Sequence, residues 1–134
     1  MRSWWVTAAL AVIALGVQVY GLYRVGAPTS PPWFPLADKV QHLFGFGVPV
    51  LLVLLTLVLR QRAYGSAVLR GRRVGLVVAA FGLHAVISEL IQGRFYRSRT
   101  GDPLDVLADT TGIQLGWLGY RLAARALDRP AVRV

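Results

Sequence analysis

The sequence predicts an all-α membrane protein, a single domain of residues 1–134 folded as a bundle of four transmembrane helices with both termini in the cytoplasm. Three observations lead to this prediction. Hydrophobic residues make up 55% of the chain and charged residues only 16%, which is too apolar for an ordinary soluble domain. Uncharged stretches of about 20 residues recur, the length that a helix needs to cross a bilayer. The basic residues also fall unevenly on the two sides of these stretches.

The composition limits the functions that the chain can have. It contains no cysteine, so disulfides, thiolate catalysis and cysteine-bound metals are excluded. The formal net charge is +9, which in a soluble protein would suggest a nucleic-acid partner. In a membrane protein the same excess of arginine is typical of cytoplasmic loops that meet anionic headgroups. We therefore expect membrane lipids as partners and no nucleic acid, because the sequence has no nucleic-acid-binding motif.

The first transmembrane helix is predicted at residues 4–23, which contain no charged residue. A signal peptide is the alternative, because Arg2 precedes the apolar run and Val25-Gly-Ala27 follows it as a weak cleavage site. The run is longer than the roughly 7–15 apolar residues of a signal peptide, which favours an uncleaved helix. Aromatic residues at both of its ends would anchor it at the two membrane interfaces.

The second helix is predicted at residues 39–59, after a loop that is rich in proline. Residues 25–36 hold prolines at positions 28, 31, 32 and 35, which prevent a helix and favour extended structure. Asp38 and His42 stand four residues apart at the start of the helix, so they share one of its faces. Five arginines follow the helix, at positions 60, 62, 70, 72 and 73.

The third helix is predicted at residues 74–92. Glu89 and Gln92 lie one turn apart near its end, which places a carboxylate and an amide on one face. His84 lies deeper in the apolar run. We expect it to be a histidine of the bundle interior that bonds a neighbouring helix.

The fourth helix is predicted at residues 104–122, with Pro103 as a favourable first-turn residue. It is the least hydrophobic of the four and would insert poorly alone. Gly112 and Gly116 have the spacing that lets two helices approach closely. This face could pack within the chain or form a homo-oligomer.

The distribution of basic residues predicts the orientation. With four crossings, one side of the membrane holds Arg2, the five arginines after the second helix and four arginines from position 121 onward, ten in all. The other side holds five basic residues. The side richer in arginine is the cytoplasmic one. The start of the second helix, the end of the third and the start of the fourth then all lie near the outer face.

This arrangement predicts a polar site that faces outward between the last three helices. Ionisable residues in a membrane cost about 2.5–3.5 kcal/mol each on insertion scales, so they persist where they pair, face the bundle interior or bind a ligand. We expect nine residues to form a ligand-binding site: Asp38, Lys39, His42, Glu89, Gln92, Arg97, Arg99, Asp105 and Asp109.

Three interpretations of this polar site are open. A histidine with two carboxylates could bind a divalent cation, but no metal-ligand spacing is present, and we expect neither a metal nor another cofactor. Glu89 could form a structural ion pair with Arg97, Arg99 or Lys39, because an unpaired buried carboxylate would protonate. Alternatively, guanidinium groups could bind a phosphate or carboxylate.

The polar motifs resemble the VanZ-like family of small bacterial membrane proteins. The resemblance rests on Asp38-Lys-Val-Gln-His42, on Glu89-Leu-Ile-Gln92 and on Arg99-Thr-Gly-Asp-Pro-Leu-Asp105-Val-Leu-Ala-Asp109-Thr-Thr-Gly112, and it covers residues 36–117. The family commonly has asparagine at the position of Asp109. The resemblance implies a multi-pass protein of the bacterial cytoplasmic membrane that is linked to low-level resistance to glycopeptides, notably teicoplanin.

The leading hypothesis is an envelope protein that binds an anionic lipid headgroup, a lipid-linked cell-wall precursor or the glycopeptide itself. Arg99 would bind the anion, Glu89 and Asp105 would hold Arg99, and Asp38 with His42 would complete the wall. The first alternative is a membrane enzyme that acts on an envelope lipid, with Glu89 or His42 as general base. The second is a structural or assembly protein in which the charges only hold the helices together.

Overall fold

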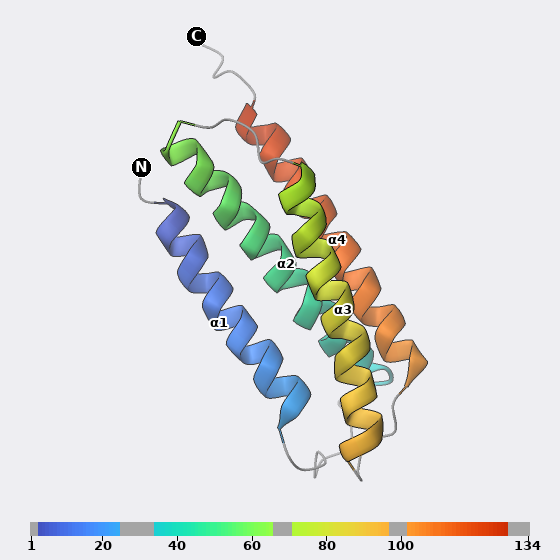
Figure 1. Ribbon diagram of the computed structural model, residues 1–134. Coiled ribbons are helices and arrows are strands. Elements are labelled where there is room, and N and C mark those ends of the chain that lie inside the picture. The colour runs from blue at the N-terminus through green and yellow to red at the C-terminus, as the bar shows by residue number, and fades with distance from the viewer. Residues whose placement is uncertain (1–2, 25–33, 66–70, 97–101, 129–134) are drawn as a thin grey trace.

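The computed structural model of the chain is all-helical, as predicted (Figure 1). The structure describes residues 3–24, 34–65, 71–96 and 102–128. These residues form four helices: α1 (Ser3–Tyr23), α2 (Ala37–Ala63), α3 (Gly71–Phe95) and α4 (Pro103–Asp128). Each predicted apolar segment lies within one of them. Apart from α1, the helices run several residues beyond their apolar segments, because the flanking arginines and other polar residues are good helix formers and continue the last turn.

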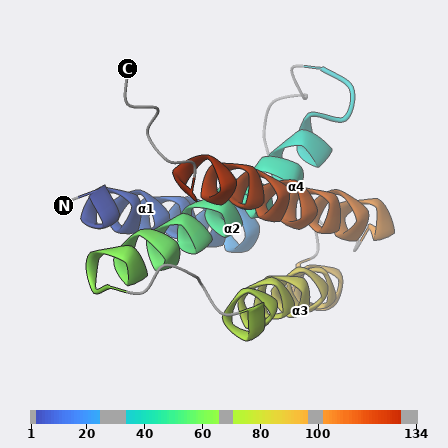
Figure 2. The same ribbon diagram turned by 90° about the horizontal axis from the view of Figure 1, so that it is seen from above.

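The helices run antiparallel in order, so that the start of α1 and the end of α4 lie at the same end of the bundle (Figure 1). The α2 helix packs most extensively against α4 and then against α1. Figure 2 shows these three close together and α3 set to one side, in keeping with its fewer contacts. The central element of the fold is therefore α2.

Three helices in the described part of the chain, α1 from Trp4 onward, α2 and α3, are long and apolar enough to cross a membrane by length and composition. Large apolar side chains also cover the outside of the bundle. Val12, Val17, Leu83, Leu90 and Leu107 are each between 61% and 69% exposed. Apolar surface on this scale is unstable in water and matches a lipid environment. The α4 helix is of similar length but is less hydrophobic.

The core follows one stripe of α2. Phe46, Val50, Leu54 and Val58 recur every four residues and are all buried, so one face of the helix is enclosed along four turns. Their packing against neighbouring helices includes an edge-to-face contact between Phe46 and Phe81 of α3, with ring centroids 6.5 Å apart.

Glycines bring α2 and α4 into backbone contact. A Cβ atom added to Gly47 would lie 2.9 Å from the carbonyl oxygen of Gly112. Cβ atoms added to Gly112 and Gly116 would overlap the carbonyl oxygens of Leu43 and Gly47. The predicted small-residue face is thus used within the chain, against α2, and a homo-oligomer through the same face stays a prediction.

Candidate functional site

The polar site occupies one end of the same helix interfaces that form the core. On α2, Lys39 and His42 precede Phe46 along the buried stripe. On α4, Asp105 and Asp109 precede the glycines that contact α2. Because residues three or four apart share a helix face, the contact that packs the core also brings these polar groups together.

Asp102 stands directly before α4 and bonds both the first turn of that helix and Glu89 of α3. The backbone amide of Leu104 donates to Asp102 Oδ1 at 2.9 Å, and Pro103 between them has no N–H group that needs an acceptor. The backbone amide of Asp102 donates to Glu89 Oε2 at 3.1 Å, which connects the start of α4 to α3. Glu89 therefore has a defined position although α3 makes few contacts.

Lys39 is the centre of a first group of charges, which we call the lysine cluster: Lys39, Asp38, Asp102 and Asp105. The Lys39 ammonium lies 2.5 Å from Asp102 Oδ2, 2.5 Å from Asp105 Oδ1 and 3.0 Å from Asp38 Oδ2. The lysine side chain is 17% exposed, and its three partners range from 13% to 61%. Its ammonium holds the pKa of Asp102 below its ordinary value. All three N–H donors of the ammonium can be used in this arrangement.

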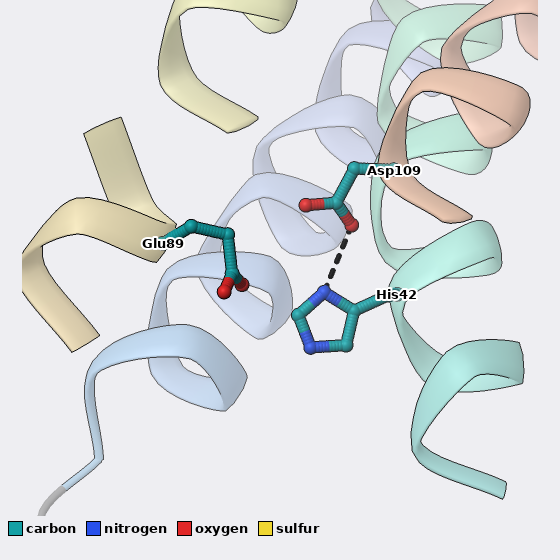
Figure 3. Close-up of side chains that lie close together, drawn as sticks. All are labelled: His42, Glu89 and Asp109. Atoms are coloured by element: carbon teal, nitrogen blue, oxygen red, sulfur yellow. Dashed lines mark hydrogen bonds and ion pairs between the residues drawn. The ribbon is translucent and has the colours of Figure 1, made fainter. Parts of the chain in front are cut away.

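A second group lies one turn deeper, and we call it the buried-acid cluster: His42, Glu89 and Asp109. His42 Nδ1 lies 2.9 Å from Asp109 Oδ1, and His42 Nε2 lies 3.8 Å from Asp105 Oδ2. Figure 3 shows Glu89 extending from α3 toward the other two side chains, with the second oxygen of Asp109 turned toward Glu89. One ligand atom from each residue lies within 4.8 Å of the others.

In the buried-acid cluster, one oxygen of each carboxylate has no partner among the described residues. Asp109 is fully buried and Glu89 is 7% exposed. Within the described part of the chain, Asp109 Oδ2 and Glu89 Oε1 have no hydrogen-bond partner. Lys39 contacts neither residue, because it is bound to the three aspartates of its own cluster. Buried, unpaired carboxylate oxygens are costly, so this arrangement calls for a proton or a cation.

A cleft of about 810 Å³ opens beside these clusters, between α1 and α2. One part of its wall is apolar and includes Ala14, Val17 and Phe44. The other part is polar and includes Lys39, His42 and Asp105, together with other polar residues: Gln18, Arg24, Asp38, Gln41, Gln92 and Asp102. Glu89 and Asp109 are not in this wall and lie behind His42. The cleft can therefore hold an amphipathic molecule, with its polar end next to the clusters.

The predicted site residues separate into several environments. Asp38, Lys39 and Asp105 join the lysine cluster, and His42, Glu89 and Asp109 join the buried-acid cluster. Gln92 is directed elsewhere: its amide donates to the carbonyl oxygen of Leu22 in α1 at 2.9 Å. The predicted partners of Glu89 and Asp105 at positions 97 and 99 lie outside the described residues. Lys39, the remaining predicted partner of Glu89, binds the aspartates instead.

The contribution of α1 to the site was missing from the sequence interpretation. Gln18 is 4% exposed and lines the cleft. Tyr96 donates to the carbonyl oxygen of Tyr23 at 2.8 Å, and the Tyr23 hydroxyl lies 3.1 Å from His84 Nε2. His84 thus bonds a neighbouring helix, as predicted. Gln18 is a polar residue within an otherwise apolar segment, and this feature of the sequence could have identified it as a candidate site residue.

Comparison of the chain with protein-family models, with curated proteins and with solved structures gives no match. The geometry of the site is therefore the basis for a functional proposal.

Proposed function

We propose that this chain is a VanZ-like protein of the bacterial cytoplasmic membrane whose cleft binds the anionic headgroup of an envelope lipid or lipid-linked cell-wall precursor. In this proposal α4 is the fourth transmembrane helix and both termini are cytoplasmic. The antiparallel order of the helices supports an even number of crossings. The excess of arginine on one side, ten basic residues against five, supports the orientation.

The α4 helix can cross the membrane although it carries aspartates. Asp105 is 13% exposed and Asp109 is fully buried, so both are enclosed by the bundle and do not face lipid. Its outer side carries Leu107, Leu115, Leu118 and Leu122, each at least 46% exposed. A helix with polar groups inward and leucines outward is suited to a polytopic bundle.

The observation that carries headgroup binding is the amide of Gln18. Both its Nε2 and its Oε1 lack a hydrogen-bond partner among the described residues, although the residue is 4% exposed and lines the cleft. An amide buried without partners costs about 1–3 kcal/mol. A bound headgroup, with phosphate oxygens as acceptors and sugar or glycerol hydroxyls as donors, would satisfy both atoms.

Arginine would supply the positive charge for the anion. Three carboxylates already bind the Lys39 ammonium, so Lys39 does not have a free positive charge for a phosphate. Arg24 lines the cleft, and Arg97 and Arg99 follow α3 in the sequence. Guanidinium groups bind phosphate through two parallel hydrogen bonds, and we assign that role to Arg99. A glycopeptide would occupy the same cleft if this member contributes to teicoplanin resistance.

The test is a thermal-shift measurement on the purified protein in detergent, with a polyprenyl phosphate and the matching uncharged polyprenol as ligands. We expect the phosphate to raise the melting temperature and the alcohol to raise it much less. The variants Gln18→Leu and Arg99→Ala should lose the phosphate-specific part of the shift. Gln114→Leu, which removes an exposed amide of α4 outside the cleft, is the matched control. Equal shifts with both ligands, or an unchanged shift in both variants, would contradict headgroup binding.

The pairing of His42 with Asp109 favours a second candidate function, acid–base chemistry on the same lipid. A carboxylate 2.9 Å from Nδ1 fixes the orientation of the imidazole, as general bases require. His42 lines the cleft, so a substrate group can reach it. Incubating the protein with lipid-linked precursors and separating the lipids by mass would detect a product. His42→Gln should abolish product formation while leaving the thermal shift in place, whereas no product from any precursor would leave binding as the function.

A further inference from the structure

We propose that His42, Glu89 and Asp109 bind one divalent cation of the Zn²⁺ or Mn²⁺ class behind the wall of the cleft. The three side chains come from α2, α3 and α4, and one ligand atom of each lies within 4.8 Å of the others. Figure 3 shows them directed at a common space. This site goes beyond headgroup binding, and neither its formation nor its test needs a lipid ligand.

The separations are close to those of a metal centre. Ligand atoms about 2.1 Å from one ion and next to each other in its coordination shell lie about 3 Å apart. The 2.9 Å between His42 Nδ1 and Asp109 Oδ1 already has this value. Ligands of a tetrahedral ion lie about 3.4 Å apart, so a pair separated by the full 4.8 Å would have to close by about 1.4 Å. The long side chain of Glu89 can make this movement by rotation about its side-chain bonds.

The unpaired carboxylate oxygens are the independent observation that points to a ligand. Asp109 is fully buried and its Oδ2 has no partner in the described residues, and the same holds for Oε1 of Glu89, which is 7% exposed. Figure 3 shows Glu89 and Asp109 on opposite sides of the space beside His42, with one oxygen of Asp109 turned toward the Glu89 side. Two neighbouring carboxylates repel unless a proton or a cation lies between them. A divalent cation would neutralise both charges, and if Asp109 binds it through both of its oxygens, the cation would also give Oδ2 a partner.

The donor set determines the class of cation. Mg²⁺ and Ca²⁺ prefer oxygen ligands throughout, whereas an imidazole nitrogen favours transition metals. One imidazole and two carboxylates suit Zn²⁺ or Mn²⁺, with coordination positions left for water or for a phosphate oxygen. His42 lines the cleft while the two acids do not, so the imidazole would separate the cation from the cleft.

Neighbouring groups are arranged as supports for the metal ligands. If Nδ1 of His42 binds the cation, Nε2 carries the proton and faces Asp105 Oδ2, 3.8 Å away. Metal-binding histidines commonly direct their second N–H at a carboxylate or a carbonyl. Glu89 Oε2 accepts a hydrogen bond from the backbone amide of Asp102, which leaves Oε1 for the cation. Asp102 and Asp105 are therefore positioning residues in this proposal.

The test uses the full chain, freed of any histidine tag and treated with a chelator. Isothermal titration with Zn²⁺ and with Mn²⁺ should give one ion per chain for at least one of the two metals. Glu89→Gln and Asp109→Asn should each weaken binding at least about tenfold. Asp128→Asn, which removes a carboxylate that is 61% exposed and paired with Arg62 at the opposite end of the bundle, is the matched control and should keep the wild-type affinity.

A spectroscopic readout on the wild-type protein keeps the test independent of variants that fold poorly. Pulsed electron paramagnetic resonance on the Mn²⁺-loaded protein, or X-ray absorption with Zn²⁺, should detect one imidazole nitrogen bound to the metal. The absence of stoichiometric binding would overturn the proposal and leave protonation as the way in which the acids are neutralised. Binding without a nitrogen ligand, or equal affinity in wild type, Glu89→Gln and Asp109→Asn, would also overturn it. Because no lipid is added, these outcomes are separate from a failure of headgroup binding.

Discussion

The lysine cluster and the buried-acid cluster are adjacent turns of the same helix interface, yet they differ in how their charges are compensated. In the lysine cluster, one ammonium lies within 3.0 Å of three carboxylates. In the buried-acid cluster, the imidazole of His42 contacts one oxygen of Asp109, and Glu89 Oε1 and Asp109 Oδ2 have no partner in the described residues. The first arrangement is complete without a ligand, and the second is not.

This difference separates two roles that polar groups have in a membrane protein. A satisfied network holds helices in register, here by joining the start of α2 to the start of α4. A group of buried polar atoms without partners destabilises the free protein, and such groups persist where they bind something. The lysine cluster therefore has the features of a structural link, and the buried-acid cluster and Gln18 have the unpaired polar atoms on which the two binding proposals rest.

The largest effect on stability should come from breaking the glycine contact on which both clusters depend. In Gly112→Val, the new side chain would overlap the carbonyl oxygen of Leu43, and backbone atoms cannot move aside cheaply. We expect a loss of about 3 kcal/mol or more, because inserting volume into a packed interface is costly. Thermal unfolding in detergent, followed by circular dichroism, measures this loss.

Gly82→Val is the matched control for this substitution. A Cβ atom at Gly82 of α3 meets no heavy atom within 4 Å among the described residues, so the same side chain fits there. Its melting temperature should stay within a few degrees of wild type. Equal losses in both variants would mean that valine destabilises these helices in general, and that the α2–α4 contact is not special.

The second-largest loss of stability should come from removing the positive charge of Lys39, the centre of the lysine cluster. Lys39→Met leaves Asp105, which is 13% exposed, without its partner, and we expect a loss of about 2 kcal/mol. The estimate is below that for a fully buried pair because Asp38 and Asp102 are partly solvated. A melting temperature lower by about 7 °C is the corresponding shift. A wild-type melting temperature would contradict the structural role of the cluster.

The sequence predicted the helices more fully than the contacts of the site. Apolar runs about as long as a bilayer is thick identify helices directly, because length and composition suffice. The partners of a charge depend on how helices are rotated against each other, which spacing along the chain does not contain. Asp105 binds Lys39, a pair that the sequence interpretation did not name, while its expected partner Arg99 lies outside the described residues. His42 meets Asp109 across 67 positions, and no local metal-ligand motif could reveal that pair.

The third prediction tests the buried-acid cluster by neutralising Glu89. In Glu89→Gln the amide oxygen can still accept from the Asp102 backbone, while the new NH₂ group can donate to the unpaired Oδ2 of Asp109. We expect the metal-free variant to be about 1 kcal/mol more stable than wild type. Thermal unfolding in the presence of a chelator measures this difference.

Adding metal should reverse the order of stability, so that wild type becomes more stable than Glu89→Gln. At a metal concentration of 100 times its dissociation constant, binding stabilises wild type by about 2.7 kcal/mol. The Glu89→Gln variant lacks one ligand and should gain much less. A metal-free variant that is clearly less stable than wild type would assign Glu89 to the structural network and remove the contrast between the two clusters.

The smallest effect should come from an ion pair at the opposite end of the bundle. Arg62 of α2 pairs with Asp128 of α4, and the side chains are 26% and 61% exposed. Like Lys39, this pair joins α2 to α4, but it is single and largely hydrated. Asp128→Asn should cost at most about 0.5 kcal/mol, and added salt should reduce even that value.

The measured quantity is the melting temperature of Asp128→Asn and Lys39→Met at low and high ionic strength. If burial and the number of partners decide what a charge contributes, only the Lys39 variant shows a large loss that persists in salt. Equal losses would mean that a bridge between α2 and α4 stabilises the bundle wherever it lies, and the lysine cluster would then have no special part in holding the site.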